Sequence, residues 1–264
     1  MPVSTMPSAQ FLLVLSTLAF LAGVAPALAA LRRGRWRRGR GVQLAAMLAG
    51  FALQTASIYL RGQQVGQCPM KSLPDILVFV AWSIALLYFL VGSTFRVSLL
   101  GMFTAPLLVV MHGLAFSFPG GFRPYPVKGQ IIALVELHAA LALVAYAAFA
   151  LACVTGVMYL LQERLLKKHL IGGLFYELPP IQGLARAIQR MVMLGVVLLS
   201  ASLGISFKLE GVAAGPKLAI AWGVWALYTL ISIVIWRHTL SPRQTAWLAA
   251  LGFVIPFISL WLVT

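Results

Sequence analysis

Histidine is the residue type in this sequence best suited to chemistry, and the chain of 264 residues contains only four: His112, His138, His169 and His238. A neutral imidazole is a good ligand for haem iron, and a membrane helix can present it to a lipophilic porphyrin. The alternative role is a histidine that hydrogen-bonds between helices. Three of the four lie within or at the ends of predicted helices, whereas His169 follows two lysines in a basic loop, where we expect contact with solvent or headgroups.

The other ionisable groups argue against ordinary enzymology. The five acidic residues all lie in loops or at the ends of predicted helices: Asp75, Glu136, Glu163, Glu177 and Glu210. A proton-driven transporter or pump would carry an acid at mid-depth. The sequence contains no phosphate-binding loop and no HExxH motif, and the two cysteines form no CxxC motif. We therefore expect a protein that is not an enzyme, with a small-molecule transporter unrelated to haem as one alternative.

The elements that must position the histidines are membrane helices. Hydrophobic residues make up 61% of the chain and charged residues only 9%, whereas soluble domains contain about 25% charged residues. This composition excludes a water-soluble globular protein. Eight uncharged stretches are long enough to cross a bilayer, which needs about 20 residues. The sequence predicts an all-α, polytopic membrane helix bundle, one domain over residues 1–264, with helices at about 8–31, 42–60, 75–95, 97–116, 130–163, 189–207, 217–236 and 244–263.

The basic residues predict the orientation of these helices. Residues 1–10 contain no Lys or Arg and six arginines follow the first apolar segment, so we expect an uncleaved helix rather than a secretory signal. With the arginine-rich loop inside, the twenty basic residues divide into fourteen in inner loops and six in outer loops, the outer ones being Arg61, Lys71, Arg123, Lys128, Lys208 and Lys217. The positive-inside rule then makes both termini external. The net charge of +15 thus marks cytoplasmic loops that contact anionic lipids, and it implies no nucleic acid.

This topology separates the histidines by depth. His112 and His138 lie near the outer ends of the fourth and fifth helices, whereas His238 lies at the inner end of the seventh. His138 and His238 therefore cannot ligate one metal ion, but His112 and His138 could form a bis-histidine site. Four aromatic side chains mark the turn-rich segment between them: Phe116, Phe118, Phe122 and Tyr125. This segment is either an interfacial aromatic belt or an apolar platform beside a ligand.

Four stretches of the sequence resemble, in order, the cytochrome c assembly family: residues 68–88, 136–163, 190–204 and 225–253. The second stretch contains Glu136-Leu137-His138 and the run from Gly156 to Glu163, and it is similar to the histidine helix of that family. The first contains Cys68-Pro69 and resembles the family's loop and third helix. The resemblance covers about residues 60–264.

The resemblance implies haem handling in the biogenesis of c-type cytochromes, in the bacterial cytoplasmic (inner) membrane. It implies haem b as the cofactor, and membrane lipids and other cytochrome c assembly proteins as partners. His138 matches an axial haem ligand on the outer side, and His238 matches a histidine of a separate haem site near the inner end. His112 is a candidate second ligand at the outer site, and Arg123 and Lys128 are candidates for pairing with haem propionates.

One segment departs from the CcsA-type exporters and synthetases of the family. Their tryptophan-rich WWD segment lies in the external loop before the penultimate helix, where residues 207–217 of this chain contain neither Trp nor Asp. This departure favours the smaller HemX/YpjD-type branch. A HemX-like membrane regulator of tetrapyrrole and haem biosynthesis is therefore the main alternative to an assembly factor.

Overall fold

The computed structural model describes residues 6–32, 36–91, 97–118, 122, 133–169, 178–209, 216–237 and 239–263. Within these ranges every regular element is an α-helix and no strand is present. Among these described residues, seven helices are long and apolar enough to cross a membrane, and Ala9–Ala25 forms a shorter apolar helix. The predicted all-α, polytopic membrane architecture is confirmed.

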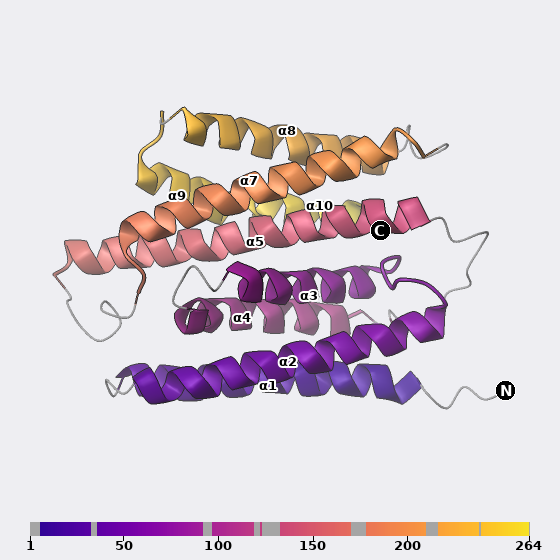
Figure 1. Cartoon of the computed structure of the whole chain (residues 1–264), viewed down its shortest axis with the longest axis horizontal. Coiled ribbons are helices and arrows are strands. Elements are labelled where there is room, and N and C mark those ends of the chain that lie inside the picture. Colours follow the sequence, from indigo (N-terminus) through magenta and orange to yellow (C-terminus); the bar gives the residue numbers. More distant parts are fainter. Residues whose placement is uncertain are drawn as a thin grey trace. The chain divides into compact units, whose positions relative to one another are not determined.

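The first of two compact units covers residues 1–131. Its helices within the described ranges are α1 (Met6–Arg32), α2 (Trp36–Val65), α3 (Leu73–Val91) and α4 (Val97–Phe116). Helices α1 and α2 lie side by side over most of their length, and α4 contacts α1, α2 and α3 (Figure 1). The close approach of α1 and α2 depends on Gly50, because a Cβ atom at this position would collide with the ring of Phe20.

The second unit covers residues 132–264. Its helices within the described ranges are α5 (Ala133–Lys167), α7 (Ile181–Ser206), α8 (Pro216–Trp236), α9 (Pro242–Gly252) and α10 (Val254–Val263). Helix α5 has 35 residues, or about 52 Å at 1.5 Å per residue, and α7 lies along it (Figure 1). In the core of this unit the ring of Phe149 fills the space left by Gly195 and stacks on Tyr228, with 3.6 Å between ring centroids.

Three predicted helices differ most from the structure, for physical reasons. Helix α7 begins at Ile181 rather than at the predicted residue 189, because Arg186 lies within the helix and not in a loop. Helix α2 continues beyond the predicted residue 60 because Arg61 is buried and ion-paired rather than solvated in a loop. The last predicted helix, 244–263, is divided at Phe253 into α9 and α10. Pro256 has no N–H to donate to the carbonyl of residue 252 in the preceding turn, which weakens the helix at this point.

Candidate functional site

The ring of His138 is held between two helices of the second unit. His138 lies in the second turn of α5, and its Nδ1 is 2.7 Å from the backbone carbonyl oxygen of Ser202 on α7 and 3.0 Å from Ser202 Oγ. The hydroxyl of Ser202 donates a hydrogen bond of 2.8 Å to the backbone carbonyl of His138. Ser202 is fully buried, and His138 is half-buried. The imidazole is therefore fixed along one edge.

These contacts determine which ring nitrogen of His138 carries the proton. A carbonyl oxygen can only accept, so Nδ1 must be the donor to Ser202. In the neutral ring Nε2 then holds a lone pair, and the described residues provide Nε2 with no hydrogen-bond partner. A histidine that ligates a metal ion has this arrangement, with its other nitrogen donating to a backbone carbonyl.

His112 is fully buried in the first unit and uses both of its ring nitrogens. Nδ1 lies 2.8 Å from Thr17 Oγ1 on α1, and Nε2 lies 2.9 Å from the side-chain nitrogen of Gln54 on α2. Because the Thr17 hydroxyl donates to the carbonyl of Leu13, it accepts from His112 Nδ1. The Gln54 amide donates both to His112 Nε2 and to the carbonyl of Val78 on α3. The neutral imidazole thus joins α4 to α1 and α2, and the Gln54 amide extends the network to α3.

Neither nitrogen of His112 can ligate iron unless one of these hydrogen bonds breaks. The structure gives His112 the alternative role that its sequence allows, a histidine bonded between helices. Because His112 belongs to the first unit and His138 to the second, a bis-histidine site formed by the two stays a prediction.

Three other residues of the predicted site, His238, Arg123 and Lys128, lie outside the described residues. Their proposed roles as a ligand and as propionate partners stay predictions. His169 is described, and it is exposed with a left-handed φ of 51°, as expected for a solvated loop histidine.

A buried ion pair at one end of the first unit corrects the sequence analysis, which assigned Arg61 to an outer loop. Arg61 Nε and Nη2 donate to the two carboxylate oxygens of Asp75 at 3.0 and 3.2 Å, and the two side chains are only 6% and 1% exposed. Nη1 donates to the backbone carbonyl of Phe122 at 2.8 Å. The hydroxyl of Ser72 donates to Asp75 Oδ2 at 2.6 Å. The pair therefore joins α2, the start of α3 and residue 122.

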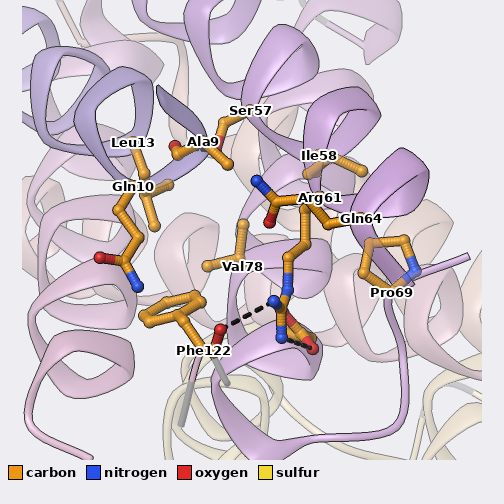
Figure 2. A pocket seen from close by; sticks show the side chains of 11 residues that line it. Ala9, Gln10, Leu13, Ser57, Ile58, Arg61, Gln64, Pro69, Val78 and Phe122 are labelled. Atoms are coloured by element: carbon orange, nitrogen blue, oxygen red, sulfur yellow. Dashed lines mark hydrogen bonds and ion pairs between the residues drawn. The ribbon is translucent and has the colours of Figure 1, made fainter. Parts of the chain in front are cut away.

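The same ion pair forms one wall of a pocket between α1, α2 and α3. Figure 2 shows the Arg61 guanidinium directed at the Phe122 carbonyl, with Leu13 and Val78 beside the same space. The cavity has a volume of about 20 Å³, which accommodates about one water molecule. The pocket in this conformation is therefore too small for a porphyrin.

Two sequence signals could have identified this pair. Gln54, Ser57 and Arg61 follow one another at intervals of three and four residues, which places them on one face of a helix. The spacing from Ser72 to Asp75 matches a capping pattern at the start of a helix. The Arg61–Asp75 pair was not predicted, because a charged residue in an apolar sequence ordinarily marks the end of a membrane helix.

The described helices offer one histidine nitrogen without a hydrogen-bond partner, His138 Nε2. Among the residues that the structure describes, no group of three or more His, Cys, Asp or Glu side chains could hold a metal ion. A haem needs only one or two axial ligands because the porphyrin supplies the equatorial nitrogens. His138 can supply one such ligand, and Leu134 and Leu137 expose apolar surface next to it along α5.

Fold and site together define a multi-pass, all-helical membrane protein that presents a histidine of fixed tautomer near the start of a long helix. The chain belongs to the cytochrome c assembly family, because the sequence pattern described as "Cytochrome C assembly protein" matches residues 70–264. The match begins after α1 and α2 and includes α3 to α10. The family resemblance recognised in the sequence is confirmed.

The curated relatives agree with this family and with its HemX-type branch. "Protein HemX" of Brevibacillus brevis is 32% identical over 159 residues, which cover 59% of this chain and 58% of that protein. "Protein HemX" of Bacillus subtilis (strain 168) is 27% identical over 158 residues, or 59% and 57%. "Cytochrome c biogenesis protein CcsA" of Chlamydomonas reinhardtii is 24% identical over 222 residues, or 75% and 58%. The chain thus spans 57–58% of the length of these relatives.

Proposed function

We propose that this protein handles haem during the biogenesis of c-type cytochromes, as a multi-pass protein of the bacterial cytoplasmic membrane that is not an enzyme. The observation that carries the proposal is the His138 ring, whose Nδ1 is held by Ser202 while Nε2 keeps its lone pair. Membership of the cytochrome c assembly family and the CcsA relative support the biological process.

In the proposed site, His138 Nε2 would bind the iron of haem b at the outer side of the membrane. The haem supplies the iron and its redox chemistry, and the protein supplies the ligand and apolar surroundings. Ser202 keeps Nδ1 protonated, so that Nε2 is ready to bind iron. His238 marks a separate haem position near the inner side, and Arg123 and Lys128 pair with propionates. Other cytochrome c assembly proteins are the expected partners.

The test is the absorption spectrum of the purified protein after titration with hemin in detergent. The wild type is expected to develop a Soret band, and His138→Ala to lose the band or most of its intensity. His169→Asn is the matched control, because His169 is exposed and asparagine tolerates its positive φ. A wild-type protein without a Soret band, or a His138→Ala variant with an unchanged one, contradicts the proposed site.

A second candidate function is control of tetrapyrrole and haem biosynthesis by a HemX-like membrane protein. The observation that favours it is the greater identity to the two proteins named HemX than to the protein named CcsA. A deletion strain separates the two functions. Loss of c-type cytochromes supports a role in assembly, whereas normal c-type cytochromes with altered levels of haem precursors support regulation.

A further inference from the structure

Ser202 contacts His138 at two places, one on the ring and one on the backbone. The single hydroxyl hydrogen of Ser202 is donated to the His138 carbonyl at 2.8 Å. The oxygen lone pairs of the same hydroxyl are then available to Nδ1, 3.0 Å away. The backbone carbonyl of Ser202 accepts from the same Nδ1–H at 2.7 Å. One serine therefore offers two acceptors to Nδ1 and at the same time ties the backbone of His138 to α7.

We propose that Ser202 is a positioning residue for haem binding, which sets the tautomer and the orientation of the His138 ring. This inference rests on the proposed function of His138 as an axial ligand. If the imidazole carried its proton on Nε2, the Ser202 carbonyl would face an unprotonated Nδ1 and this contact would become repulsive. The Ser202 hydroxyl could then donate to Nδ1 only by giving up its hydrogen bond to the His138 carbonyl. The arrangement thus selects the one neutral tautomer that leaves Nε2 able to bind iron.

The site also explains why a small hydroxyl residue is suited to this position. Ser202 is completely buried where α5 and α7 pack together, so a long polar side chain such as glutamine would force the helices apart. Alanine would fit, but it would remove the donor to the His138 carbonyl and one of the two acceptors for Nδ1. Threonine keeps a hydroxyl on the same carbon atom. Serine and threonine therefore share the hydroxyl that contacts His138, and alanine lacks it, so the effect of this hydroxyl can be measured.

The experiment compares Ser202→Ala with Ser202→Thr and with Ser206→Ala in the full chain. Ser206 is the matched control, because it is also buried on α7 and its hydroxyl donates only to the carbonyl of Leu203 in its own helix. The measured quantities are the hemin dissociation constant, the reduction potential of the bound haem and the Fe–His stretching frequency of the ferrous protein. The potential and the stretching frequency respond to the ligand and do not follow general stability.

We expect Ser202→Ala to weaken hemin binding about 10-fold, at the lower end of the range for residues that support a metal ligand, because the backbone carbonyl remains. Loss of an acceptor at Nδ1 makes the imidazole a weaker donor, so the reduction potential should rise and the Fe–His frequency should fall. Ser202→Thr should restore the values of the wild type, and Ser206→Ala should not change them. Ser202→Cys, which has a similar volume and a weak hydrogen-bonding group, gives the same readout if the alanine variant does not fold.

The outcomes separate this inference from the function on which it rests. A His138-dependent Soret band together with unchanged affinity, potential and Fe–His frequency in Ser202→Ala overturns the role of Ser202 and leaves the proposed function intact. Equal changes in Ser202→Ala and Ser206→Ala also overturn it, because they indicate a general effect of α7. The absence of any His138-dependent band in the wild type overturns both.

Discussion

The buried ion pair of the first unit leads to a quantitative prediction for Asp75→Asn. This substitution removes the carboxylate charge and keeps the size of the side chain, so Arg61 stays buried without its counter-charge. The two side chains are 6% and 1% exposed. Removing one partner of a buried pair costs about 3–5 kcal/mol of unfolding free energy, whereas an exposed pair contributes about 0–1 kcal/mol.

The lower end of the range for a buried pair applies to Asp75→Asn, because the Phe122 carbonyl still accepts a hydrogen bond from the guanidinium of Arg61. A loss of about 3 kcal/mol corresponds to a decrease in Tm of about 6–12 °C, at about 2–4 °C per kcal/mol for a chain of this size class. The measurement is thermal unfolding of the detergent-solubilised protein by circular dichroism. All variants are heated at one scan rate, since membrane proteins often unfold irreversibly.

Two further variants control this experiment. Glu163→Gln breaks the ion pairs of Glu163 with Lys167 and Arg243, whose side chains are 60% and 57% exposed. An exposed i,i+4 pair contributes up to about 0.5 kcal/mol and another exposed pair up to about 1 kcal/mol, so the Tm should fall by no more than about 3–6 °C. The double variant Arg61→Met with Asp75→Leu replaces the buried pair with apolar groups and should recover most of the loss. An Asp75→Asn protein that melts at the same temperature as Glu163→Gln refutes the reasoning, because burial would then add nothing to the pair.

Two other substitutions test the packing of the first unit in the same unfolding assay. His112→Ala should lower the unfolding free energy by about 1–3 kcal/mol, because one N–H of the buried Gln54 amide loses its acceptor; a variant as stable as the wild type would show that the network contributes nothing. Gly50→Ala should cost about 1–3 kcal/mol through collision with the Phe20 ring. Gly113→Ala, where the added methyl group meets no other atom within 4 Å, should be neutral or slightly stabilising, and equal effects of the two glycine variants would contradict the close approach.

The helices were accessible from the sequence because the bilayer imposes one rule on every spanning segment. Backbone groups in hydrocarbon must be hydrogen-bonded within the segment, so a long uncharged run in a polytopic chain forms a helix. The positions at which the helices begin and end were harder to predict where a charge is buried, as at Arg61, or where a proline interrupts the hydrogen bonds of the helix, as at Pro256. The burial of Arg61 depends on the residues packed around it, which the sequence pattern does not show. Pro256, in contrast, is a local signal in the sequence itself.

The candidate site, like the fold, was only partly predictable from the sequence. The scarcity of ionisable groups left the histidines as candidates, and the family resemblance around Glu136 and Leu137 then singled out His138. His112 had the same prior claim from its residue type and depth. Only the contacts with Thr17 and Gln54 distinguish it, because they occupy both of its nitrogens.

The sequence by itself determined the fold class, the family and the small set of candidate haem ligands, because each follows from residue types and their order along the chain. The tertiary structure decided which nitrogen of His138 keeps its lone pair, that His112 is bonded on both sides, and that Arg61 meets Asp75. These decisions depend on partners 64, 58 and 14 residues away in the chain. The packing of helices brings such partners together, and hydrogen-bond chemistry then assigns each group its role.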